Sequence, residues 1–105
     1  MELKDKGTVT IEKGNKKQIK CHRFMYNPIH RELMVHEDID NKNHASVSDC
    51  ITGYRLFVLP QKISAVKPSD ITERLTQYIS HYTKEEVIKE FKRVENLQQT
   101  KSKKA

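Results

Sequence analysis

The chain is poor in residues that many familiar folds and chemistries require. Among its 105 residues it has no tryptophan, three glycines, three prolines and two cysteines, and 35% of its residues are hydrophobic. It contains no glycine-rich loop that could cradle a phosphate, which argues against the common nucleotide-using enzymes. Typical globular domains are roughly 45–50% apolar, so we expect a thin core that a partner or a homodimer would extend.

Long hydrophobic segments are also missing. The longest apolar run, residues 56–59, is far shorter than the ~20 residues that a membrane-spanning helix needs. The N-terminal residues lack the apolar centre of a signal peptide. We therefore expect a soluble cytoplasmic protein without membrane association, in which Cys21 and Cys50 are free thiols rather than a disulfide.

The net charge of +6 is unevenly distributed along the chain. Residues 1–31 carry eight Lys and Arg against three acids, residues 32–49 carry one Lys against five acids, and residues 50–105 are basic again. The pI near 9.4 permits an anionic partner such as nucleic acid. It does not require one, because lysine-rich surfaces also keep small proteins in solution.

The first 60 residues show the alternating pattern of β-strands. Residues 8–13 predict one strand, and a three-residue loop over residues 14–16 leads into the next. We prefer this loop length because it keeps apolar partners together across the hairpin. The predicted pairs are Val9 with Cys21 and Ile11 with Ile19.

A third strand and a second hairpin follow. Residues 32–37 predict the strand, and residues 44–59 predict a hairpin that turns at Thr52 and Gly53. A two-residue loop there places Val47 opposite Val58. Pro60 ends the run, since proline cannot donate to a strand ladder.

The remaining residues predict two helices. Ser69 can cap the first helix, whose apolar stripe consists of Ile71, Leu75, Tyr78 and Ile79. Thr83 and Glu86 form a capping box for the second helix. We predict an α+β fold: an antiparallel sheet of about five strands followed by a C-terminal αα-hairpin packed on one face. Residues 1–97 form this single domain, and residues 98–105 form a basic flexible tail.

The sequence contains no clear pattern of metal ligands or catalytic residues. Cys21 and His22 are adjacent, and neighbouring strand residues point to opposite faces, so they form neither a ligand pair nor a nucleophile–base pair. The other Cys and His spacings do not match a zinc knuckle. We predict no metal, no cofactor and no enzymatic activity.

The segment from residue 16 to residue 26 is the best candidate for a binding surface. Over residues 18–26, period-two alternation places Ile19, Cys21 and Met25 on the core face, with Arg23 breaking the pattern, and leaves basic and aromatic side chains on the other. Lysines in the preceding loop, at residues 16 and 17, would extend the positive surface. Lysines that neutralise phosphates, beside rings on which bases stack, are how sheets hold single-stranded DNA or RNA. The predicted nucleic-acid-binding residues are Lys16, Lys17, Lys20, His22, Phe24 and Tyr26.

Alternatives to this assignment remain open. Phe24 and Tyr26 can instead lie under the helices, or the sheet can be covered on both faces. The sequence thus favours a small non-enzymatic accessory or regulatory protein that contacts nucleic acid. The alternative is a protein-interaction or inhibitor module that uses the acidic residues 32–40, a strand edge or a homodimer interface.

Overall fold

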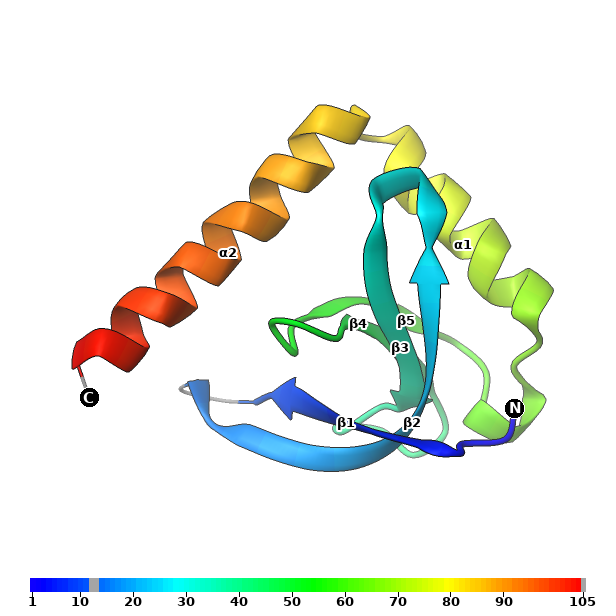
Figure 1. The fold of residues 1–105 in the computed structure, drawn as a ribbon. Coiled ribbons are helices and arrows are strands. Elements are labelled where there is room, and N and C mark those ends of the chain that lie inside the picture. The colour runs from blue at the N-terminus through cyan, green and yellow to red at the C-terminus, as the bar shows by residue number, and fades with distance from the viewer. Residues whose placement is uncertain (12–13, 105) are drawn as a thin grey trace.

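The computed structural model describes residues 1–11 and 14–104. It shows the predicted α+β architecture, a five-stranded antiparallel sheet followed by two C-terminal helices (Figure 1). The strands lie in the sheet in chain order: β1 (Asp5–Thr10), β2 (Lys16–Tyr26), β3 (Arg31–Glu37), β4 (Ala45–Asp49) and β5 (Arg55–Leu59). Short 3-10 helices η2 (Asn27–Ile29) and η3 (Ile63–Ala65) follow β2 and β5. None of the helices described here is long and apolar enough to cross a membrane.

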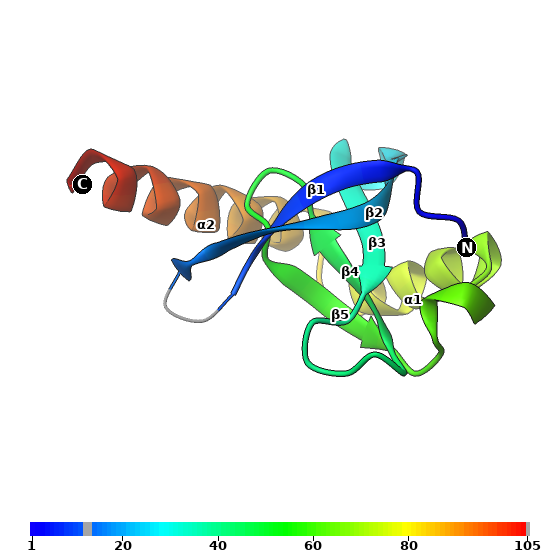
Figure 2. The same ribbon diagram turned by 90° about the horizontal axis from the view of Figure 1, so that it is seen from below.

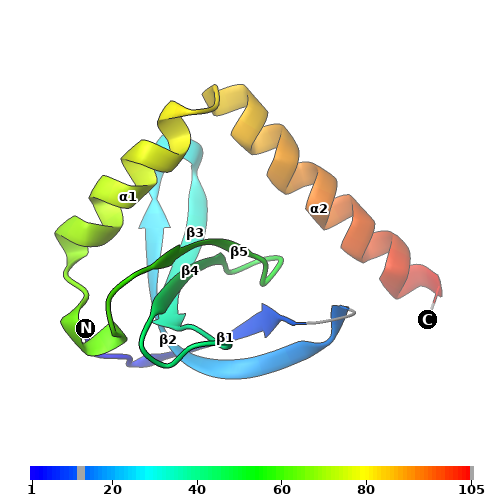
Figure 3. The same ribbon diagram turned by 180° about the vertical axis from the view of Figure 1, so that it is seen from behind.

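The two helices, α1 (Pro68–Ser80) and α2 (Lys84–Lys104), diverge as the arms of a V (Figures 1 and 3). α1 begins one residue before the predicted cap: Lys67 is the N-cap residue, and its backbone N–H donates to the Asp70 carboxylate at 2.9 Å. The prediction that Ser69 caps this helix is therefore wrong. At α2 the hydroxyl half of the predicted capping box is confirmed, because the Glu86 N–H donates to the Thr83 hydroxyl at 3.1 Å. α2 extends to Lys104 and so includes most of the segment predicted as a tail.

The sheet has hydrophobic clusters on both faces. The larger one lies between the sheet and α1, where Ile71 and Leu75 pack against buried residues of β3, β4 and β5. The smaller one consists of Val9, Cys21 and Met34. It lies beneath the β1–β2 hairpin, which crosses over β3 and β4 in Figure 2. Residues 33–36 are consequently all buried, so the alternative of a sheet covered on both faces is confirmed for β3.

The predicted faces of β2 are correct only for its first half. Cys21 is buried as predicted, but Met25 is 57% exposed, while Phe24 and Tyr26 are half-buried and pack against the α1-side cluster. The cause is that β1 pairs with β2 only as far as Cys21, and beyond that point β2 pairs with β3 alone. Phe24 lies opposite Leu33, on the face that α1 covers.

The predicted register of the first hairpin is also wrong. Val9 pairs with Lys17, and Gly7 pairs with Ile19. The shift is an even number of residues, so the predicted apolar residues still share a face. In this register Gly7 lies against Met34, where an added Cβ would be 2.5 Å from the Met34 sulfur. Part of the predicted strand, residues 12 and 13, lies outside the described residues.

The second hairpin differs from its prediction by one residue. Val47 pairs with Phe57 rather than with Val58, and a bulge follows at Ser48. The loop has four residues instead of two, since the Asp49 N–H donates to the Tyr54 carbonyl at 2.9 Å. We call residues 50–53 the β4–β5 turn. A side chain, rather than the loop sequence alone, determines this longer turn.

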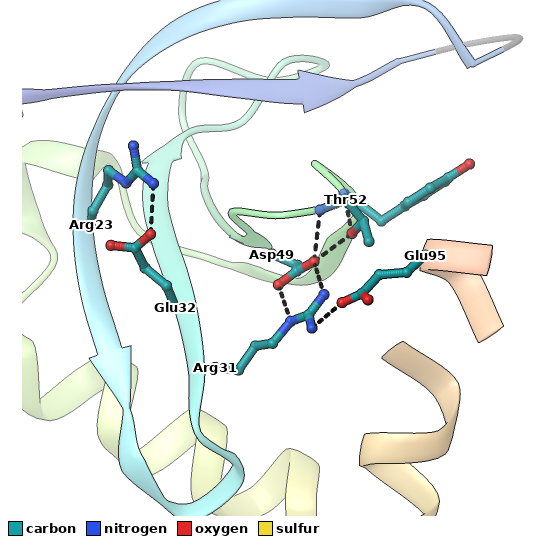
Figure 4. Close-up of polar contacts among 7 residues, drawn as sticks. Arg23, Arg31, Glu32, Asp49, Thr52 and Glu95 are labelled. Atoms are coloured by element: carbon teal, nitrogen blue, oxygen red, sulfur yellow. Dashed lines mark hydrogen bonds and ion pairs between the residues drawn. The ribbon is translucent and has the colours of Figure 1, made fainter. Parts of the chain in front are cut away.

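The side chain in question is the carboxylate of Asp49, which has no exposed surface. It accepts two hydrogen bonds from the Arg31 guanidinium, at 2.6 and 2.7 Å (Figure 4). It also accepts the backbone N–H and hydroxyl of Thr52, at 2.8 and 2.6 Å. Arg31 additionally pairs with Glu95 of α2 and lies over the ring of Phe91, 4.6 Å from its centroid. One guanidinium therefore joins β3, the β4–β5 turn and α2.

We predict that Arg31→Met lowers the free energy of unfolding by about 3–5 kcal/mol, because it leaves the Asp49 charge buried without its partner. Urea denaturation measures the change. The control is Arg93→Met, which removes an exposed pair with Glu90 and should leave the unfolding midpoint nearly unchanged. Equal midpoints for the two variants would contradict the role assigned to Arg31.

Candidate nucleic-acid interface

One face of the β1–β2 hairpin is largely exposed and basic, and its Thr10–Lys16 end contacts the β4–β5 turn. Directly paired residues of antiparallel strands lie on the same face, and the even-numbered positions of this hairpin are exposed except for the half-buried Thr10. We call these six residues the outer row: Lys6 and Lys20, Thr8 and Gln18, and Thr10 and Lys16. Three of the six are lysines and none is acidic.

Lys6 and Lys20 lie directly opposite each other in the outer row. Like charges at such paired positions destabilise a sheet. Neither lysine has an acidic neighbour within the row that would offset the repulsion. An anion from outside the chain would bind more favourably beside such a pair than beside an isolated lysine, because it would also relieve the repulsion between the two ammonium groups.

Lys16 is exposed, but its ammonium group is held in place. It donates to the Thr10 hydroxyl at 2.6 Å and to the Thr52 carbonyl at 3.1 Å. Burial lowers the pKa of this ammonium. An ammonium has three N–H donors. Lys16 uses two of them in these contacts, one of which joins the hairpin to the β4–β5 turn, and the third remains for an anion.

The structure separates the other predicted site residues from the outer row. Lys17 is opposite Val9, on the inner face of the hairpin. His22 stacks on Phe24, with ring centroids 6.3 Å apart, and Phe24 and Tyr26 both pack on the α1-side cluster. Lys6 is not among the predicted residues, and only the observed register places it beside Lys20.

In the acidic segment, the alternative binding site, Glu32 and Asp38 are engaged within the molecule, while Glu37 and Asp40 are exposed. Glu32 pairs with Arg23 at 2.6 Å (Figure 4). Asp38 accepts a hydrogen bond from Arg55 at 2.8 Å and another from the Ser46 hydroxyl. These contacts occupy two of the four carboxylates that could attract a basic partner.

The cysteines have the character of structural thiols. Both are free, and burial raises the pKa of Cys21 and raises that of Cys50 to about 11. Thiols with such raised pKa values are protonated at neutral pH and are poor nucleophiles and metal ligands. Over residues 1–11 and 14–104, no three His, Cys, Asp or Glu side chains are grouped so that they could hold a metal ion.

A second feature lies on the inner side of the hairpin. A cleft of about 560 Å³ opens between the hairpin tip and the ends of β3, β4 and β5. We call it the polar cleft, and the residues that matter here are Lys17, His36, Asp38, Ser48, Tyr54 and Arg55. Sequence reasoning could not find it, because its lining comes from three separate segments of the chain.

The floor of the polar cleft is a hydrogen-bonded pair. His36 and Ser48 are each 1% exposed, and the His36 Nε2 lies 2.8 Å from the Ser48 hydroxyl. The His36 Nδ1 lies 2.8 Å from the Glu37 carbonyl, which can only accept, so Nδ1 carries the proton and Ser48 donates to Nε2. Burial lowers the pKa of His36, so the ring is neutral at pH 7.

Comparison with protein-family models, with curated proteins and with solved structures finds no match. The evidence on function is therefore the chemistry of the outer row and of the polar cleft.

We predict that His36 titrates below the unfolded-chain value of about 6.5. The unfolded chain then binds this proton more readily, so the stabilisation is complete above about pH 6.5 and is lost as the pH falls through the folded-state pKa. Titration of the His36 ring by NMR, together with urea denaturation between pH 7.5 and pH 5, measures both effects. A His36 pKa at or above 6.5 would contradict the assigned hydrogen bonds.

Proposed function

We propose that the protein is a small non-enzymatic accessory protein that binds nucleic acid through the outer row of the β1–β2 hairpin. The observation that carries the proposal is the directly opposed pair of Lys6 and Lys20, in an exposed row that contains a third lysine and no acid. Phosphates placed against this row would neutralise the repulsion between the two lysines. The binding energy would be mainly electrostatic.

The outer row is long enough for several phosphates of a nucleic-acid backbone to lie along it. Lys16 and Lys20 are four residues apart on one strand, which corresponds to about 13 Å. Thr8 and Gln18 lie between the two ends and provide uncharged hydrogen-bond donors. A nucleic-acid backbone can therefore run along the hairpin and meet an ammonium at each end.

The proposal differs from the sequence prediction in the part that the aromatic residues take. Phe24 and Tyr26 pack on the core, so stacking on β2 does not enter the proposed mode of binding. The competing function, a protein-interaction module that uses the acidic segment, draws less support because arginines already pair with Glu32 and Asp38, which leaves Glu37 and Asp40 as its exposed acids.

We predict salt-sensitive binding of a 12-nucleotide single strand, measured by fluorescence anisotropy. If three lysines contact phosphates, the affinity falls about 20-fold between 50 and 200 mM salt. Lys20→Glu should lower the affinity about tenfold, whereas Lys89→Glu, the same charge change at an exposed position on α2, should have little effect. Equal losses in the two variants would indicate attraction by net charge alone and would contradict the outer row as the site.

Lys20→Glu should also stabilise the folded protein while it weakens binding. The substitution converts the opposed lysines into an oppositely charged pair, which is worth about 0.5 kcal/mol. Urea denaturation of the free protein measures the gain. A loss of binding in a variant that is at least as stable as the parent cannot be attributed to misfolding. A clearly destabilised Lys20→Glu variant would show that Lys20 has a structural partner instead.

A further inference from the structure

We infer that the polar cleft receives one unpaired nucleobase from the strand bound on the outer row, and that the protein therefore prefers single-stranded to duplex nucleic acid. This inference rests on the proposed function. It is carried by three observations: the chemistry of the cleft floor, an exposed aromatic ring at the cleft, and the position of the cleft beside the basic hairpin.

The floor of the cleft is polar where a purely structural sheet would be apolar. On β4, Val47 faces the α1-side cluster, but the residues on either side of it, which face the hairpin, are Ser46 and Ser48. Both serines are fully buried. Valine at these positions would add apolar burial beside a small cluster. Ser48 lines the cleft itself, and Ser46 donates to Asp38, which also lines it. Buried polar groups at the base of a cleft are the arrangement by which proteins orient small ligands.

These polar groups match the edge of a nucleobase. Ser48 uses its proton on His36 and keeps oxygen lone pairs that can accept from an exocyclic amino group. Burial opposes ionisation of Asp38, but hydrogen bonds from Ser46 and Arg55 outweigh it and hold the pKa of that carboxyl below its ordinary value. Asp38 is thus an acceptor, and Arg55 and Lys17 are donors. A base presents donors and acceptors together on one planar edge.

The cleft also offers apolar surface for the face of a base. Tyr54 is 39% exposed and Ile39 is 40% exposed, and both line the cleft. Enzymes and binding proteins that accept an unstacked base hold it against aromatic or apolar side chains. Stacking on an aromatic ring commonly contributes about tenfold or more in affinity.

The cleft and the outer row meet at one end of the hairpin. Thr10 and Lys17 line the cleft, and Thr10 with Lys16 ends the outer row. Lys16 and Lys17 are consecutive, so their side chains leave the strand on opposite faces: Lys16 belongs to the outer row and Lys17 lines the cleft. A backbone that passes Lys16 can direct its base around the hairpin into the cleft. A base held in a duplex cannot make this movement without unpairing.

The test compares a 12-nucleotide single strand with a 12-base-pair duplex at 50 mM salt. The parent protein should bind the single strand about tenfold more tightly. Tyr54→Ala and Ser48→Val should each remove that preference and leave duplex binding unchanged. Tyr54→Phe, which keeps the ring, should retain it. Tyr82→Ala is the matched control, because Tyr82 is 52% exposed and is not among the residues lining the cleft.

A second readout does not depend on affinity or on the folding of a variant. A single strand that contains 5-iodouracil should cross-link under light to Tyr54 in the parent protein, as peptide mass mapping would reveal. Equal affinity of the parent for both nucleic acids overturns the inference and leaves the outer row as the binding site. Binding of neither form overturns both proposals. A single-strand preference that persists in Tyr54→Ala and Ser48→Val, with no cross-link at Tyr54, places the bases elsewhere and also overturns it.

Discussion

The arrangement of this protein depends on the buried carboxylate of Asp49. Its two oxygens accept four hydrogen bonds, two from Arg31 and two from Thr52, and no part of its side chain is exposed. A carboxylate buried in this way is stable only if its charge and lone pairs are satisfied. The β4–β5 turn therefore has the one conformation that brings Thr52 to Asp49, and α2 is held through the contact of Arg31 with Glu95.

The basic hairpin takes its position from that turn. The Thr10 N–H donates to the Gly53 carbonyl at 2.8 Å, and the Thr10 hydroxyl and the Lys16 ammonium donate to the Thr52 carbonyl. Gly53 has a φ of 74° and lies against β1 so closely that a Cβ would be 2.8 Å from backbone atoms of Thr8 and Thr10. Polar contacts carry this docking because the apolar cluster beneath the hairpin has only three buried residues. The small size of this cluster is a consequence of the low hydrophobic content of the chain, 35%.

The sequence could predict the elements of the fold but not how they are aligned. Alternation and turn residues identified the strands, and Thr83 correctly marked the start of α2. Registers were wrong because they depend on contacts between distant residues, namely Gly7 with Met34 and Asp49 with Arg31. The errors in strand pairing carried over to the candidate site. The sequence predicts Lys16 and Lys20 correctly, but without the register it cannot place Lys6 beside them. Phe24 and Tyr26 are predicted on the exposed face because the sequence does not show where β1 ends. The polar cleft, built from separated segments, left no local pattern in the sequence.

The central claim is that the hairpin and the turn on which it docks form one binding surface. The most direct test is a titration of the ¹⁵N-labelled protein with a short single strand, followed by the backbone amide shifts. The account predicts that the shifts gather in the outer row and in residues 52–55, on one continuous surface, while the amides of α1 stay unchanged. Shifts confined to the helices, or spread evenly over the exposed lysines, would contradict it.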